Sequence, residues 1–376
     1  MSADSPHEFR HRVLVPAALV LASLAFCVLA LEAILRIAGW PHQPARLLCY
    51  DPVIGNVYCP GVEALPDNMY DSRFPVRVNS EGMVDREFAR AKPPGTLRIA
   101  LLGDSVTASI YVRPPEKFAA LWEAALAARL GRPVEILNFA VEGSSTWDQL
   151  QLFHLRARHF QPDFVVLGFF WGNDVWNNEA LQSRGRPNPL ADEYPAPTFA
   201  TGLKVAQRRL ARWLWNNTYA YQFVRRLQTR AATIAEYDAA VERARAADGG
   251  APSPQAVAND PAFVWQSSGW ELTRRLILKL EAESAAIGAK LVVVQIPMLD
   301  QLGRARPLPY RELREFLAAN GIANVDPFDA FAALPESAVP GLFLEDRVHL
   351  SVGGQKFFAA ATAPQLAAAV QNRRVP

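Results

Sequence analysis

Five short runs of apolar residues alternate with longer helical segments in the chain after residue 95. The runs lie at 96–102, 133–139, 162–170, 289–298 and, more weakly, 321–328. None of them alternates apolar and polar positions, so each predicts a strand buried on both faces of a sheet. Helical patterns lie between them, at 116–131, 146–160 and 269–288. Strands that alternate with helices of this length predict βαβ units, an α/β fold and a parallel sheet.

A different pattern occupies the N-terminal region, where residues 13–31 contain no charged side chain. Nineteen helical residues span about 28 Å, close to the hydrocarbon thickness of a bilayer. The run is longer than the apolar core of a signal peptide, and no convincing cleavage site follows it. Arg10 and Arg12 precede it and favour a cytoplasmic N-terminus. We therefore predict a cytoplasmic tail at 1–12 and an uncleaved transmembrane anchor at 13–38, with a buried core helix as the alternative.

Residues 39–95 are rich in proline and turn residues, which predicts an extended lead-in with a few short strands. Within it, Cys49 and Cys59 flank a short loop. They would form a disulfide in an oxidising compartment, or remain two free thiols.

The α/β domain is expected at 96–376, interrupted by a helical insertion at about 180–262. The insertion carries a basic, aromatic segment at 203–230. Its simplest interpretation is an amphipathic helix that packs its aromatic side chains on the domain and leaves its arginines in solvent. A lid over the site, a contact with lipid headgroups and a surface for an acidic glycan are the alternatives.

Composition changes this picture little. The 376 residues suffice for one sizeable domain with additions, and the formal net charge is only +2. Basic and acidic residues are mixed along most of the chain, which argues against a nucleic-acid partner. No Cys or Cys/His cluster has the spacing of a zinc site, so we predict no metal and no cofactor.

Three polar motifs follow the first three predicted strands. Ser105, in Gly-Asp-Ser, lies where a strand turns into a helix, so its hydroxyl is placed to face a substrate; the alternative is an N-cap residue. Gly143 follows the second strand, where its N–H can approach a ligand or where it simply closes a turn. Asn173 follows the third strand, and its amide can donate to a developing oxyanion or close a turn.

The chain contains six histidines, each a candidate for the base that activates Ser105. A serine hydroxyl needs a base to take its proton, and that imidazole needs a carboxylate on its other nitrogen. His349 lies near the end of the α/β pattern, three residues after Asp346. The other histidines lie beside the anchor or within the helical segment after the second strand: His7, His11, His42, His154 and His159. We therefore predict that Asp346 orients His349 and that His349 activates Ser105.

Together these motifs resemble the SGNH (GDSL-like) hydrolase family, over about residues 97–370. The resemblance implies a flavodoxin-like three-layer α/β/α sandwich with a parallel sheet. It implies Ser105 as nucleophile, His349 as base and Asp346 as its orienting carboxylate. It also implies an oxyanion hole formed by the N–H groups of Ser105 and Gly143 and by the side chain of Asn173.

Two further features bear on this resemblance. Gly172 adjoins Asn173 directly, whereas the third block of the family is usually Gly-x-Asn-Asp. The lead-in VNSEGMVDREF at 78–88 resembles membrane-anchored bacterial members of the family. It implies a single-pass protein of the bacterial inner membrane with a periplasmic catalytic domain.

Three functions compete at this stage. The first is a serine esterase that removes O-acyl groups from an envelope glycan or a lipid. The second is an O-acyltransferase, which would pass the acyl group to a polysaccharide hydroxyl instead of water. The third is a non-catalytic glycan-binding domain. The expected partners are an acylated glycan or lipid and the membrane; the oligomeric state is left open.

Overall fold

The computed structural model describes residues 14–40, 46–65, 74–172, 174–191, 199–225, 227–228, 268–299, 302 and 308–371. The described residues fall into two compact units. The larger unit takes in those between 47 and 208 and between 268 and 371. The smaller unit takes in those between 14 and 46 and between 209 and 228.

A five-stranded sheet forms the centre of the larger unit. Its strands are β5 (Leu97–Leu102), β6 (Val134–Asn138), β7 (Phe164–Phe170), β8 (Lys290–Ile296) and β9 (Ala323–Val325). Their order is β6-β5-β7-β8-β9, and every neighbouring pair is parallel. The chain moves from β5 to β6 on one side and then returns to β7 on the other. This is the flavodoxin-like order, and its switch point lies at the carboxyl end of β5, where ligands bind in open α/β sheets.

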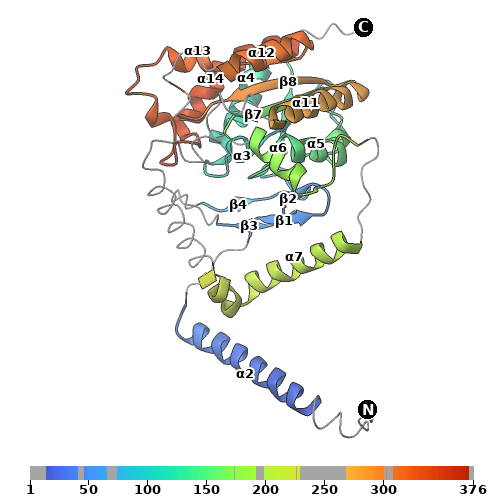
Figure 1. The fold of residues 1–376 in the computed structure, drawn as a ribbon. Coiled ribbons are helices and arrows are strands. Elements are labelled where there is room, and N and C mark those ends of the chain that lie inside the picture. The colour runs from blue at the N-terminus through green and yellow to red at the C-terminus, as the bar shows by residue number, and fades with distance from the viewer. Residues whose placement is uncertain are drawn as a thin grey trace, which may run out of the picture. The chain divides into compact units, whose positions relative to one another are not determined.

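Helices cover both faces of this sheet, as Figure 1 shows. On one face α4 (Phe118–Leu130) packs against α14 (Val352–Gln371). On the other face α11 (Ser268–Ala286) packs against α5 (Thr146–Leu155) and α6 (Asp174–Ser183). The remaining helices of this unit are short or peripheral: α3 (Ser105–Ala108), α12 (Leu308–Ala319), α13 (Phe328–Ala332) and the 3₁₀ turns at Pro114–Glu116, Ala157–Phe160 and Pro340–Leu342. The predicted three-layer α/β/α sandwich is thereby confirmed.

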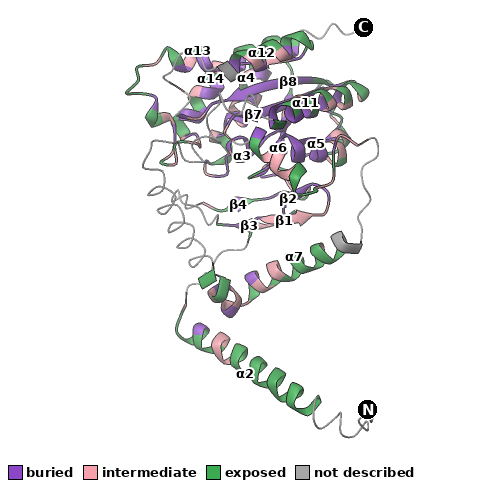
Figure 2. Ribbon diagram, in the orientation of Figure 1, coloured by how far each residue is buried: buried purple, intermediate pink, exposed green. Residues whose placement is uncertain are grey.

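The sheet is buried on both faces, which explains its unalternating apolar runs (Figure 2). One residue of β5 breaks the apolar pattern, because Arg98 is completely buried. Its guanidinium pairs with Glu135 at 2.6 Å and donates to the carbonyl oxygens of Arg90 and Phe160. A buried charge is tolerated only when it is paired and hydrogen-bonded, and Arg98 meets both conditions.

The described part of the lead-in contains two small antiparallel strand pairs. β1 (Leu48–Asp51) pairs antiparallel with β2 (Gly55–Tyr58), and β3 (Glu63–Ala64) pairs with β4 (Val76–Arg77). The open alternative at Cys49 and Cys59 is settled, because the two residues form a disulfide with their Cα atoms 5.0 Å apart. This bond closes the first hairpin.

The smaller unit contains α2 (Val15–Ile37), an apolar helix of 23 residues with almost no buried side chain. It is the one helix of the described residues that is long and apolar enough to cross a membrane, a property that anchors share with signal sequences. Its C-terminal end is held by polar contacts. Glu32 accepts the backbone N–H of Ala220 at 2.8 Å, and Arg36 donates to the carbonyl oxygen of Asn217 at 3.1 Å.

The insertion contributes α7 (Phe199–Asn217). The expectation that the aromatic side chains of this helix pack on the domain is not met by Trp213, and Trp215 packs within the smaller unit. Trp215 is buried and stacks beneath the guanidinium of Arg46, whereas Trp213 is 57% exposed. The helical period of 3.6 residues shows which side chains share a face of the helix. It does not show whether another segment packs on that face and buries them. Most of the remaining insertion, 229–262, lies outside the described residues.

Candidate active site

Ser105 lies at the switch point of the sheet, as the first residue of α3. The residue before it, Asp104, is the N-cap of this helix, and its carboxylate accepts the N–H of Val106 at 3.0 Å. The capping role that was the alternative for Ser105 is therefore filled by its neighbour, which leaves the serine hydroxyl for another partner. Gly103 permits the sharp turn, because a Cβ atom there would collide with the side chain of Thr107.

His349 is that partner. Its Nε2 atom lies 2.9 Å from Ser105 Oγ, and its Nδ1 atom is hydrogen-bonded to Asp346 Oδ2. The other carboxylate oxygen of Asp346 accepts the backbone N–H groups of Val348 and His349, both at 3.0 Å. Asp346 therefore holds its own turn together and the imidazole in place. The structure brings together a hydroxyl, an imidazole and a carboxylate in the order that nucleophilic catalysis requires.

Tyr111 is a neighbour of this arrangement that sequence reasoning missed. Its ring packs edge-on against the imidazole of His349, with the ring centroids 4.8 Å apart. Its hydroxyl donates to Glu142 Oε1 at 2.7 Å. Burial raises the pKa of Glu142, while the bond from Tyr111 opposes the shift. Tyr111 thereby connects the histidine with the loop that carries Gly143, and no sequence spacing signals this contact.

Gly143 lies at the carboxyl end of β6, next to the end of β5. The two strand ends are joined because Gly103 O accepts both the N–H of Val141 at 3.1 Å and the hydroxyl of Ser144 at 2.7 Å. Gly143 has a φ of +70°, which favours glycine, and a Cβ atom there would meet nothing within 4 Å. Its backbone therefore borders open space beside the serine turn.

Asn173 lies outside the described residues, so its predicted role remains a prediction. The next residue, Asp174, is buried and begins α6. Its carboxylate accepts the N–H of Phe170 at 3.0 Å, which closes the end of β7.

Two buried carboxylates lie close to the serine turn. Burial raises the pKa of Asp104 to about 6, and the nearby His349 opposes this shift. Burial raises the pKa of Asp174 well above its ordinary value, and the charge of Asp104 raises it further. Two like charges in a buried site repel, so the carboxylate of Asp104 opposes ionisation of Asp174.

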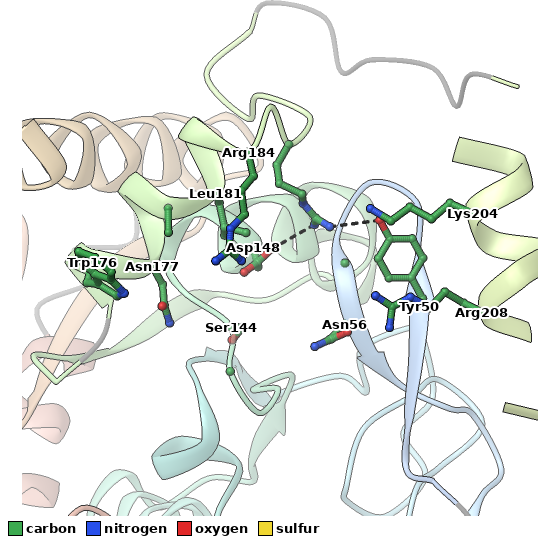
Figure 3. Close-up of a pocket in the computed structure, with 14 residues that line it drawn as sticks. Tyr50, Asn56, Ser144, Asp148, Trp176, Asn177, Leu181, Arg184, Lys204 and Arg208 are labelled. Atoms are coloured by element: carbon green, nitrogen blue, oxygen red, sulfur yellow. Dashed lines mark hydrogen bonds and ion pairs between the residues drawn. The ribbon is translucent and has the colours of Figure 1, made fainter. Parts of the chain in front are cut away.

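A pocket of about 370 Å³ opens beside this site, and Gly143 and Ser144 line it (Figure 3). Within the described ranges, no group of three or more His, Cys, Asp or Glu side chains is placed to hold a metal ion.

A comparison with known protein families agrees with this geometry. The model of the GDSL-like lipase/acylhydrolase family matches residues 101–357. The chain belongs to this family. It is accordingly a serine hydrolase of the SGNH (GDSL-like) type, as the sequence motifs predicted. No match was found among curated proteins.

Several solved structures are similar to this GDSL-like hydrolase. TesA has a TM-score of 0.40 and 14% identity, covering 72% of this chain and 98% of its own. A lipase/acylhydrolase from Enterococcus faecalis has a TM-score of 0.38 and 16% identity, covering 73% and 96%. A catalytic mutant of Axe2, an acetylxylan esterase from Geobacillus stearothermophilus, has a TM-score of 0.39 and 15% identity, covering 72% and 94%.

Proposed function

We propose that this chain is a membrane-anchored serine esterase that removes O-acyl groups from a glycan or lipid of the bacterial envelope. The observation that carries the proposal is the continuous hydrogen-bonded path from Ser105 Oγ through His349 to Asp346. In a family of acylhydrolases, this path is the machinery for forming and hydrolysing an acyl-serine.

The proposed reaction begins when His349 Nε2 takes the proton of Ser105 as its oxygen attacks the ester carbonyl. Asp346 keeps Nδ1–H in place and stabilises the imidazolium that forms. The oxyanion would be stabilised by the N–H groups of Ser105 and Gly143 and by the amide of Asn173. His349 then protonates the leaving alcohol, which departs. Water, deprotonated by the same imidazole, releases the acid and restores the serine.

Two observations support an extracytoplasmic, membrane-bound location. The first is α2, which is long and apolar enough to serve as the anchor predicted at 13–38. The second is the disulfide between Cys49 and Cys59, because such bonds persist in oxidising compartments. Both are consistent with a cytoplasmic tail at 1–12 and with the lead-in 39–95 and the domain 96–376 in the periplasm. The helical insertion at about 180–262 would then also be periplasmic.

The experiment that tests this proposal is hydrolysis of acetylated glycans and of a small aryl acetate by the detergent-solubilised full chain. We expect acetate release by the wild type and none above background by Ser105→Ala. Arg314→Gln, on an exposed site of α12, is the matched control and should retain full activity. Absence of release from all esters by the wild type would contradict the proposal and favour the non-catalytic alternative.

A second assay separates hydrolysis from transfer. The wild type is incubated with an acyl donor in the presence and absence of a deacylated glycan acceptor. An esterase releases the same amount of free acid in both mixtures, because water is its acceptor. Recovery of acyl groups on the glycan, with a matching loss of free acid, would show that the protein is an O-acyltransferase and not an esterase.

A further inference from the structure

The pocket beside Gly143 has an unusual charge balance. It is lined by Tyr50, Gly55, Asn56, Gly143, Ser144, Asp148, Trp176, Asn177, Ala180, Leu181, Arg184, Arg186, Lys204 and Arg208. Four of these side chains are cationic and only Asp148 is anionic. All belong to the larger unit, and the glycine that borders the serine turn is part of the wall.

The single carboxylate is already neutralised. Arg186 lies 3.4 Å from Asp148 of α5 and also donates to the carbonyl oxygen of Val53, between β1 and β2, at 3.0 Å. Its guanidinium therefore links α5 to this hairpin. Burial raises the pKa of Asp148 to about 6, although Arg186 opposes the shift. The remaining cations are therefore not balanced by the carboxylate of the pocket.

Two of these remaining cations lie over one ring. Lys204 Nζ lies 5.4 Å from the ring centroid of Tyr50, and the guanidinium carbon of Arg208 lies 5.5 Å from it (Figure 3). Arg184 is exposed on the same pocket. Among the described residues, none of the three has a carboxylate partner. Three cations around one hollow repel one another, and an anionic ligand would relieve that repulsion.

The other lining residues suit a sugar. Trp176 is 54% exposed, so its flat face is open to stack on the C–H groups of a pyranose ring. Asn56 and Asn177 add amide groups that can both donate to and accept from hydroxyls. An exposed indole, amides and unbalanced cations together fit an acidic sugar better than they fit a lipid tail.

We propose that this pocket binds a carboxylate-bearing sugar residue of the acylated substrate, with Arg184, Lys204 and Arg208 facing the carboxylate. The inference rests on the proposed esterase function and narrows its substrate to an O-acylated acidic glycan. The bound sugar would lie beside Gly143, so that an acyl group on it or on its neighbour can reach Ser105.

Binding is measured first, independently of catalysis. A deacylated oligouronate is titrated into the full chain carrying Ser105→Ala, with a neutral oligosaccharide and an oligosaccharide phosphate as the other arms. We expect the oligouronate to bind most tightly. Its Kd should rise more than tenfold when Arg184→Gln, Lys204→Gln and Arg208→Gln are added, and stay unchanged with Arg314→Gln. A thermal unfolding midpoint equal to that of the parent shows that the triple variant is folded.

Other outcomes overturn the inference. Equal binding of the neutral and acidic oligosaccharides, or an unchanged Kd in a folded triple variant, would remove the acidic-sugar assignment. Tighter binding of the oligosaccharide phosphate than of the oligouronate would show that the pocket prefers a phosphate group to a carboxylate. Because this assay needs no turnover, it can fail while the esterase assay succeeds, and the reverse.

A separate observation concerns α7. Leu203, Leu210 and Trp213 recur at spacings of seven and three and so share one helix face. All three are exposed, by 63%, 57% and 57%. Arg208 and Arg212 lie on the opposite side of the helix by the same geometry. An amphipathic helix with an uncovered apolar face, a tryptophan and flanking arginines has the composition of an interfacial membrane helix.

The end of α7 is tied to the predicted anchor. Within the smaller unit, Arg36 donates to Asn217 O, and its guanidinium lies 4.8 Å from the ring centroid of Tyr219. Glu32 accepts from Ala220. These contacts hold the residues that follow Trp213 at the C-terminal end of α2, where a spanning helix leaves the bilayer. We infer that the exposed face of α7 lies in the headgroup region of the anchoring membrane.

Lipid-depth quenching tests this inference. The full chain is reconstituted in nanodiscs containing anionic lipid, with Cys27→Ser and one new cysteine that carries an environment-sensitive dye. Quenching by a shallow spin-labelled lipid should be at least twofold stronger at Leu210→Cys and Trp213→Cys than at Arg208→Cys on the opposite face. Equal quenching at the three positions, or none at Leu210 and Trp213, would contradict the inference.

Discussion

The imidazole of His349 lies within hydrogen-bond distance of the hydroxyl of Ser105, 2.9 Å away, although 244 residues separate the two in the chain. The serine turn lies at the carboxyl end of β5, at the switch point of the sheet. The turn around Asp346 holds the imidazole of His349 next to it. Asp346 and Tyr111 both contact the imidazole of His349 and hold it in this position.

Asp346→Asn is expected to lower kcat for a small ester by roughly 100- to 10,000-fold, because the amide no longer stabilises the imidazolium and favours the wrong tautomer. KM should change little, since Asp346 does not contact substrate in the proposed reaction. Steady-state kinetics of the purified variant check this. An activity within threefold of the wild type would remove Asp346 from the mechanism.

Tyr111 is expected to position His349 rather than to react. Tyr111→Phe keeps the ring packed on the imidazole and loses only the bond to Glu142, so kcat should fall by about 2- to 10-fold, as for one hydrogen bond. Tyr111→Ala removes both contacts and should lower kcat further and shift its pH profile. If alanine and phenylalanine variants have the same profile as the wild type, the ring does not support the base.

The buried carboxylates predict a pH-dependent stability. Asp104 has an ordinary pKa of about 3.9 when unfolded, and burial raises it to about 6 in the folded chain. The folded state therefore binds more protons than the unfolded state between these pH values. The contribution of Asp104 to the free energy of unfolding is fully present below pH 4 and is lost as the pH rises through 6. The difference is on the order of 3 kcal/mol. Asp104→Asn should flatten the decline in unfolding free energy between pH 4 and pH 7, measured by denaturant titration. A slope identical to that of the wild type would contradict the assignment.

Removal of the lead-in disulfide is expected to destabilise the larger unit. Cys49→Ser with Cys59→Ser frees a short closed loop, and the loss of such a bond is typically worth about 2–4 kcal/mol. Cys27→Ser is the control, because Cys27 is a free, exposed cysteine on α2 and should not change the unfolding midpoint. Equal midpoints for the double variant and the control would show that the disulfide does not hold the hairpin.

Much of this architecture could be predicted from local patterns. The apolar runs identify the strands because both faces of the sheet are covered. Arg98 is the exception, explained by its ion pair with Glu135 and its hydrogen bonds to two carbonyl oxygens. Ser105 could be selected because it follows a buried strand directly. His349 could be selected because an Asp, Asp346, precedes it by three residues, which is true of no other histidine of the α/β domain.

Other features could not be predicted, because they depend on contacts between distant segments. Nothing in the sequence places Tyr111 against His349 or assigns the N-cap to Asp104 instead of Ser105. Periodicity indicates an apolar face on α7, but it does not tell whether that face is covered, and Trp213 is exposed. The pocket joins residues of the lead-in, the β6–α5 loop and the insertion, and so has no signature in any one of them.

Mass spectrometry of the full chain after reaction with a fluorophosphonate shows directly which serine is the nucleophile. We expect one covalent adduct, located on the peptide that contains Ser105, with labelling lost in Ser105→Ala and strongly slowed in His349→Ala. An adduct on a different serine, or an unlabelled Ser105 in a preparation that hydrolyses esters, would contradict the assignment of Ser105 as the nucleophile.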